Sequence, residues 1–142
     1  MATDPSSRIV IRAKLDELAN LGRWVAVQAV EFVLPPPLAN RIDLCLAEHV
    51  TNVIGYGYPA GTPGTIIISL WHRPDELVVR IEDDGVAFDP TSYALPDLPR
   101  SLADARDGGH GVRLIRHFAD ELHYARVASA NELILKFRAP PH

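Results

Sequence analysis

The sequence predicts an α+β fold, a two-layer sandwich in which helices cover one face of a mixed or antiparallel sheet. Two observations lead to this prediction. Helical periodicity comes first along the chain and strand-like alternation follows, with one further helix among the later strands. The two central strand-like stretches are joined by the short turn Arg73-Pro74-Asp75, which suits an antiparallel hairpin.

Composition narrows the class of protein. The chain has 142 residues, so we expect residues 1–142 to form a single domain, with flexible tails at 1–7 and 139–142. The net charge of −4 argues against a direct nucleic-acid partner. A single cysteine excludes a disulfide within the chain. Without a long apolar run or a signal peptide, we expect a cytoplasmic protein with no membrane partner.

The amino-terminal half is predicted to form a strand followed by two helices. Residues 8–12 are rich in β-branched side chains and predict a short strand. Apolar residues recur at steps of three and four over residues 14–34, which predicts an amphipathic helix. The run Pro35-Pro36-Pro37 is expected to end it. A second helix over residues 38–54 is predicted by a buried stripe, with Cys45 and His49 at its margins: Ile42, Leu46, Val50 and Val53.

The remainder is predicted to be mostly strand. Glycine and proline between residues 55 and 64 indicate a loop. Residues 65–72 and 76–82 alternate, which predicts a hairpin with one face on the core. Residues 89–108 lack periodicity, and a loop of this length in a compact domain favours a mobile lid. A helix from residue 111 and strands at residues 123–127 and 132–137 complete the prediction.

Glu48 and Asn52 are the first candidate functional pair. They lie four residues apart on one helix face, about 6 Å apart along the axis. Asn52 can offer its side-chain carbonyl to Mg²⁺, and Glu48 can orient or deprotonate an attacking hydroxyl or water. Such pairs also occur on solvated helices, so a purely structural role stays open. His49 is expected to be a packing or rim residue, because no second His or Cys stands at ligand spacing.

Two glycine-bearing stretches add to this pair. Asp83 ends a predicted strand and Gly85 allows a sharp turn, so Asp83 could accept a hydrogen bond from an exocyclic amine such as that of adenine. A plain Asp-Gly turn is the alternative. The run Gly108-Gly109-His110-Gly111 precedes a helix, where amide groups and the helix dipole bind phosphate. It matches neither the P-loop nor the Rossmann fingerprint, and a flexible hinge is the alternative.

Taken in order, these stretches resemble the motifs of the GHKL ATPase superfamily, named for gyrase, Hsp90, histidine kinases and MutL. Residues 44–52 are similar to its N-box, 81–90 to its first glycine box and 108–115 to its second. Within the superfamily, residues 8–138 look like the small anti-sigma factor serine/threonine protein kinases. The resemblance implies a Bergerat ATP-binding fold, ATP with Mg²⁺ as cofactors, and phosphoryl transfer to a serine or threonine of a partner.

The resemblance also implies roles for individual residues. Glu48 would be the catalytic general base and Asn52 the Mg²⁺ ligand. Asp83 would accept the adenine amine, with Gly85 beside the ring. Asn131 stands where the family places a small polar residue near adenine. The remaining nucleotide-binding residues that it implies are Ala87 and Phe88 in the first glycine box, and Gly109, His110, Gly111 and Val112 at the phosphates.

Three positions depart from the family pattern. Ala87 stands where a second glycine is common, and Tyr56-Gly57-Tyr58 lacks the histidine that often follows the N-box. The predicted lid has no lysine, so an arginine would meet the γ-phosphate, with Arg106 favoured by position over Arg100 and Arg113. A solvated arginine is the alternative at Arg106.

The expected function is that of an anti-sigma factor kinase, with a sigma factor and a small anti-sigma factor antagonist as partners. One alternative is a partner-switching module that binds ATP without kinase activity. A detached ATP-binding domain of a histidine kinase is another, disfavoured because no helical hairpin with a phospho-accepting histidine precedes the motifs. The resemblance further suggests a homodimer, for which the first helix could serve as interface or as core.

Overall fold

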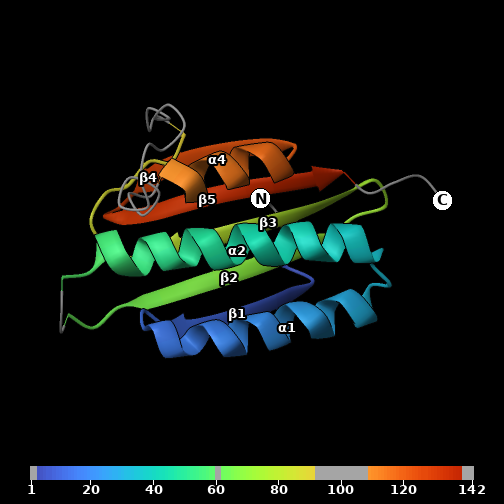
Figure 1. Cartoon of the computed structure of the whole chain (residues 1–142), viewed down its shortest axis with the longest axis horizontal. Helices are drawn as coiled ribbons and strands as arrows, with labels where there is room; N and C mark the ends of the chain where they lie inside the picture. Colours follow the sequence, from blue (N-terminus) through green and yellow to red (C-terminus); the bar gives the residue numbers. More distant parts are fainter. Residues whose placement is uncertain (1–2, 60–61, 92–108, 139–142) are drawn as a thin grey trace.

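The computed structural model describes residues 3–59, 62–91 and 109–138. Its strands form one antiparallel sheet in the order β1-β2-β3-β5-β4, and helices α1, α2 and α4 cover the sheet (Figure 1). The predicted α+β sandwich is therefore confirmed. The elements are β1 (Ser7–Arg12), a 3₁₀ turn (Leu15–Glu17), α1 (Leu18–Glu31), α2 (Pro36–Gly57), β2 (Thr65–His72), β3 (Glu76–Asp83), α4 (Gly109–Phe118), β4 (Glu121–Val127) and β5 (Ala130–Arg138).

The core lies between the helices and one face of the sheet. Alternate residues of the three central strands are buried, and the cross-strand register aligns them in rows, such as Ile68, Ile81 and Leu133. They join one hydrophobic cluster with Leu46 of α2 and Ile115 of α4. Each fully buried aliphatic side chain of this kind contributes roughly 1.5–3 kcal/mol of transfer free energy. The predicted period-two pattern of β2 and β3 is thereby confirmed.

The proline run begins the second helix and does not end the first. α1 ends at Glu31, and α2 starts at Pro36 with prolines at its first two positions, where no intrahelical N–H bond is needed. α2 also continues through Gly57, so the loop predicted from residue 55 begins later. Cys45 and His49, predicted at the margins of the buried stripe, are 0% and 3% exposed. The reason is that α2 packs against both α1 and α4 as well as the sheet.

A strained residue ends α1. Leu34 N–H donates to Ala29 C=O at 2.9 Å and Val33 N–H donates to Val30 C=O at 3.2 Å, the pattern of a Schellman motif. The left-handed position of this motif usually holds glycine, whereas Val33 occupies it here with φ 51°. The first predicted helix therefore stops at Glu31 and is preceded by a separate 3₁₀ turn.

The amino-terminal residues lie along β2. Ser6 N–H donates to Leu70 C=O at 2.7 Å, and Trp71 Nε1 donates to Thr3 C=O at 3.0 Å, while the flexibility expected for residues 1–7 stays a prediction. Residues 1–2 and 139–142, and the part of the predicted lid at 92–108, lie outside the described residues. No helix within the described ranges is long and apolar enough to cross a membrane.

Three segments meet at one end of the molecule. The carboxyl end of α2, the end of β3 and the start of α4 all lie toward the left of Figure 1. Direct contacts support this view, because α2 packs on α4 and Val86 N–H donates to Gly57 C=O at 2.9 Å. The three stretches that the sequence singled out are therefore neighbours in space.

Candidate functional site

Asp83 is the last residue of β3, and its side chain is only 4% exposed. Its Oδ1 accepts two hydrogen bonds, from Gly85 N–H at 3.0 Å and from Asn131 Nδ2 at 2.9 Å. Burial raises the pKa of this carboxyl above its usual range, while the same two hydrogen bonds oppose the rise. No described residue donates to Oδ2, so that oxygen is available to accept from a ligand.

Asn131 holds Asp83 and the following turn in place. It lies in β5 directly opposite Asp83, inside the strand and not before it as predicted. Besides Asp83, Nδ2 donates to Val86 C=O at 2.9 Å, and Oδ1 accepts from Phe88 N–H at 3.3 Å and from the Tyr124 hydroxyl. Tyr124 was not predicted, because nothing in the local sequence of β4 links it to the distant Asn131.

Close approach of two backbones requires glycine at the turn after β3. A Cβ on Gly85 would lie 2.7 Å from Gly57 C=O and 3.1 Å from Asp83 Oδ1. The carbonyl of Gly85 accepts a hydrogen bond from Arg126 Nη1 at 2.8 Å, and the carbonyl of Gly57 accepts one from Val86 N–H. The last turn of α2 and the turn after β3 are thus fixed against each other.

A second link joins the same two segments. The Tyr58 hydroxyl donates to Asp84 Oδ1, and Asp84 N–H donates back to the hydroxyl oxygen at 3.1 Å. The hydrogen bond from Tyr58 lowers the pKa of Asp84, and burial raises the pKa of Tyr58. The pairing of Tyr58 with Asp84 was not predicted. It depends on α2 ending at Gly57, three residues after the expected end at residue 54.

Ala87 and Phe88, the remaining candidate residues of the first glycine box, follow the turn after β3. Ala87 is exposed, and the Phe88 ring stacks on Tyr56 of α2 with centroids 6.0 Å apart. Arg116 of α4 donates to Pro90 C=O at 3.1 Å and to Thr91 C=O, which ties the next segment to α4. Arg106 and Arg100, predicted near the γ-phosphate, lie outside the described residues.

Glu48 and Asn52 lie on α2 beside this turn. Asn52 is 8% exposed, and its Nδ2 has no hydrogen-bond partner among the described residues. A buried unpaired amide costs about 1–3 kcal/mol, so its presence points to a polar ligand at that position. Glu48 is half-buried. His49, between them, is fully buried, and burial lowers its pKa to about 4, which confirms that it packs in the core.

The second glycine motif opens α4. The helix begins at Gly109, two residues before the predicted start, so Gly109, His110, Gly111 and Val112 form its first turn. The side chains of these residues lie outside what the structure describes. Free backbone N–H groups and the positive end of the helix dipole make such a first turn suitable for a phosphate.

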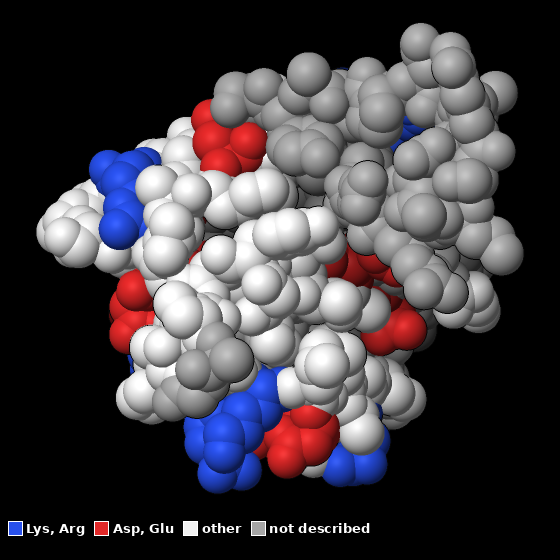
Figure 2. Space-filling model, turned by 60° about the vertical axis from the view of Figure 1, so that its left-hand side comes forward, with Lys and Arg blue, Asp and Glu red and all other residues white. Residues whose placement is uncertain are grey.

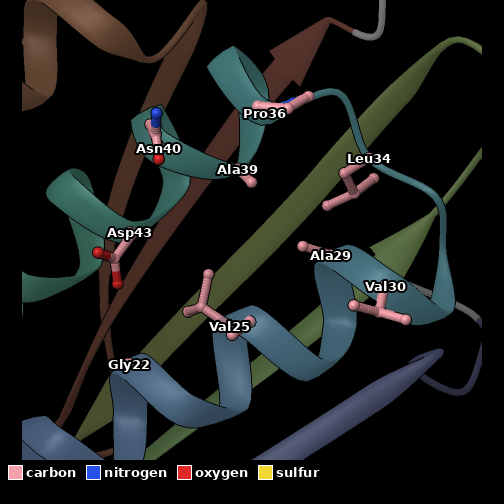
Figure 3. A pocket seen from close by; sticks show the side chains of 10 residues that line it. Gly22, Val25, Ala29, Val30, Leu34, Pro36, Ala39, Asn40 and Asp43 are labelled. Carbon is pink, nitrogen blue, oxygen red and sulfur yellow. The ribbon is translucent and has the colours of Figure 1, made fainter.

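Among the described residues, two cavities flank α2 on different sides. One of about 360 Å³ lies between α2 and α4 and is lined by Glu48, Arg113, Leu114, His117 and Phe118. The other, about 400 Å³, lies between α1 and α2, where small apolar side chains meet Asn40 and Asp43 (Figure 3). Glu48 belongs to the first cavity only.

Acidic side chains lie around the centre of the end that carries these segments. Figure 2 brings this end forward and shows a mainly uncharged centre in its described part, with Asp and Glu side chains beside it and Lys and Arg side chains toward the edges of the view. A buried aspartate beside a glycine turn, an amide-bearing helix and a helix that opens on glycines lie together at this end of the molecule.

Comparison with known proteins agrees with the resemblance to GHKL ATPases. Residues 11–137 match the histidine kinase-like ATPase domain family. The chain is 36% identical over 127 residues to the serine/threonine-protein kinase BtrW of Bordetella bronchiseptica, which covers 89% of this chain and 82% of that protein. It is 27% identical over 115 residues to the anti-sigma F factor of Clostridium perfringens, covering 79% of this chain and 82% of the relative. With the anti-sigma F factor of Clostridium novyi it shares 30% identity over 100 residues, 69% and 70% of the two chains.

A solved structure shows the same fold. The histidine kinase domain of the blue-light activated histidine kinase from Erythrobacter litoralis EL346 superposes with a TM-score of 0.56 at 20% identity and covers 86% of this chain. This chain spans 60% of the length of that domain. The protein therefore belongs to the histidine kinase-like ATPase domain family, and the resemblance to GHKL ATPases is confirmed.

Proposed function

We propose that this protein is an ATP-dependent serine/threonine kinase that phosphorylates a small anti-sigma factor antagonist and thereby controls a sigma factor. The observation that carries the proposal is the meeting of three segments: the end of α2, the turn after β3 and the start of α4. The names of its relatives, a serine/threonine-protein kinase and anti-sigma F factors, support the choice of reaction and partners. In this proposal the kinase, the antagonist and the sigma factor all act in the cytoplasm.

The residues present fit a magnesium nucleotide. Asp83 offers one carboxylate oxygen to the adenine amine, because its other oxygen is engaged by Gly85 and Asn131. The buried, unpaired Nδ2 of Asn52 can donate a hydrogen bond to a phosphate oxygen, and its side-chain carbonyl is the atom that would hold Mg²⁺, since Mg²⁺ commonly takes one or two protein ligands together with phosphate oxygens. The bound metal supplies charge neutralisation for the phosphates.

Glu48 performs the proton step in this proposal. It lies one helical turn before Asn52, so its carboxylate is placed to accept the proton of an acceptor hydroxyl beside the phosphates. The first turn of α4 adds backbone N–H donors to the phosphate oxygens. Phosphoryl transfer needs mostly positioning and charge stabilisation, which these groups can provide.

Glu48→Gln tests the assignment. The variant should bind Mg·ATP within twofold of the parent by calorimetry, yet transfer γ-phosphate to a purified antagonist about 10²–10⁴-fold more slowly. Glu31→Gln, the same change on α1 outside the site, is the matched control and should keep the parent rate. Parent-like transfer by Glu48→Gln would refute the base role. Asn52→Ala should weaken ATP binding more strongly with Mg²⁺ present than without it.

A binding module without kinase activity is the second candidate. Ala87 stands where the family often has glycine, which adds a Cβ at an exposed position beside the nucleotide turn. ATP binding by the parent protein with no transfer to any antagonist would favour this alternative.

A further inference from the structure

The cavity between α2 and α4 gives Glu48 an outlet to solvent. Its volume of about 360 Å³ falls in the range of ligand pockets, roughly 300–1,000 Å³. Glu48 is half-buried at its wall, and no described residue donates a hydrogen bond or an ion pair to its carboxylate. A half-buried carboxylate without a protein partner is open to a ligand that enters this cavity.

The cavity is separate from the proposed nucleotide contacts. None of its described lining residues comes from the turn after β3 or from β5, and Asn52 is not among them. On α4 it is lined by Arg113, Leu114, His117 and Phe118, which follow the first turn of that helix. The nucleotide would therefore approach Glu48 from the start of α4, and the cavity reaches the same carboxylate from farther along the helix.

The other cavity beside α2 does not reach Glu48. It opens at Asp43, five residues earlier on α2, which is about 140° around a helix of 3.6 residues per turn. Figure 3 shows Asp43 of α2 on the side that is turned toward α1. Of these two cavities, the one between α2 and α4 has Glu48 among its described lining residues and the one between α1 and α2 does not.

We propose that the cavity between α2 and α4 receives the serine- or threonine-bearing segment of the protein acceptor; this inference rests on the proposed function. Leu114 and Phe118 form an apolar wall for the side chain next to the acceptor residue. Arg113 and His117 form the polar wall and favour an acidic side chain nearby. Arg113 and His117 are thus specificity-determining residues for the acceptor.

Transfer moves the γ-phosphoryl group from ATP to the acceptor hydroxyl. The acceptor hydroxyl donates its proton to the Glu48 carboxylate while its oxygen forms a bond to the γ-phosphorus. The bond between that phosphorus and the bridging oxygen breaks, and its electron pair leaves with ADP. Glu48 releases the proton to solvent after the phosphorylated segment departs. An acceptor that fills the cavity also excludes the water that would otherwise hydrolyse ATP.

Two cysteine variants test the inference by blocking the cavity. Cys45 is the only native cysteine, it is 0% exposed, and burial raises its pKa to about 12, so a maleimide will react selectively with an introduced thiol. His117→Cys puts that thiol at the cavity wall. His123→Cys is the matched control, because His123 lies on β4 with a side chain that is 60% exposed, between residues that face the core.

The readouts are protection and turnover, measured with [γ-³²P]ATP and a panel of purified bacterial anti-sigma factor antagonists. An antagonist that the parent protein phosphorylates should slow maleimide labelling of Cys at 117 at least fivefold and leave labelling at 123 unchanged. Once labelled with a bulky maleimide, His117→Cys should lose transfer more than tenfold while Mg·ATP affinity stays within twofold. Labelled His123→Cys should transfer at the rate of the unlabelled protein. His117→Glu should raise KM for the antagonist at least tenfold with kcat within twofold.

The outcomes separate the two claims. The acceptor role of the cavity is refuted by any of three results. These are no protection of the thiol at 117, transfer at the parent rate by the labelled protein, and an unchanged KM in His117→Glu. Loss of ATP affinity on labelling at 117 also overturns it, because the cavity would then belong to the nucleotide site. If the parent protein transfers phosphate to no antagonist of the panel, the proposed function fails, and the acceptor cavity fails with it.

Discussion

Asp83→Asn changes one atom of the proposed adenine contact and gives a specific prediction. Oδ1 of residue 83 is held by Gly85 N–H at 3.0 Å and by Asn131 Nδ2 at 2.9 Å, so asparagine must keep its oxygen at this position. Its Nδ2 then replaces the carboxylate oxygen that faces the ligand. An acceptor becomes a donor, while the surrounding hydrogen bonds stay intact.

The expected effect on ATP follows from this exchange. A hydrogen bond to a charged group is worth about 1.5–3 kcal/mol, so its loss weakens ATP binding about 10- to 150-fold. Inosine triphosphate carries a carbonyl where ATP carries its amine and should gain affinity for the variant. Calorimetric titration of the parent and the variant with both nucleotides measures this reversal. Asp84→Asn is the matched control, because Asp84 is bonded to Tyr58 and should not change the preference.

The same substitution should stabilise the protein without nucleotide. The pKa of Asp83 is raised in the folded state, so the carboxylate costs stability as pH rises from its unfolded pKa through the folded one. Asparagine removes that cost, and the gain in unfolding free energy should be largest at neutral pH and vanish below about pH 4. A variant that binds ATP as the parent does, with no gain for inosine triphosphate, would refute the role of Asp83.

Three further substitutions test the packing around the site. Gly85→Ala places a Cβ 2.7 Å from the Gly57 carbonyl oxygen and displaces the hydrogen bond that this oxygen accepts from Val86 N–H. The free energy of unfolding, measured in urea, should therefore fall by about 1–3 kcal/mol, and a fall below about 0.5 kcal/mol would contradict the close approach. Burial lowers the pKa of His49 from 6.5 to about 4, so the parent should lose up to about 3 kcal/mol of unfolding free energy as pH falls from 6.5 to 4. His49→Leu should reduce this dependence of stability on pH. An equal dependence in the parent and the variant would show that His49 is not the cause. Val33→Gly should raise the free energy of unfolding by about 1 kcal/mol, because φ is 51° there. Val30→Gly inside α1 should lower it by roughly 0.5 kcal/mol, and a loss of stability at residue 33 would contradict the strain.

The layers of the fold were predictable because each sheet strand has its own short-range pattern. In β2 and β3 the residues that join the hydrophobic cluster alternate, although Ser69, Trp71 and Val78 between them are also buried, and one face of α2 repeats at helical steps. The ends of α2 were not predictable from such patterns. Proline is tolerated in a first helical turn, and Gly57 stays helical because its carbonyl is bonded to Val86 in a distant turn.

The candidate site was predictable in part for the same reason. Asp83 and Gly85 form a local signal, a strand end followed by a turn. Their partners come from segments far along the chain: Asn131 is opposite Asp83 only because β3 pairs with β5, and Arg126 reaches Gly85 only because β4 lies beyond β5. Hydrogen bonds of this kind depend on strand order, which single-sequence patterns do not contain.

The central claim is that the end of α2, the turn after β3 and the start of α4 bind one Mg·ATP. A titration of ¹⁵N-labelled protein with Mg·ATP, followed by two-dimensional NMR, tests it most directly. Backbone amide signals of Asn52, of Gly85 and Phe88, and of Gly109 and Gly111 should all shift along a single binding curve. A segment whose signals stay unchanged, or move with a different midpoint, would contradict one shared nucleotide site.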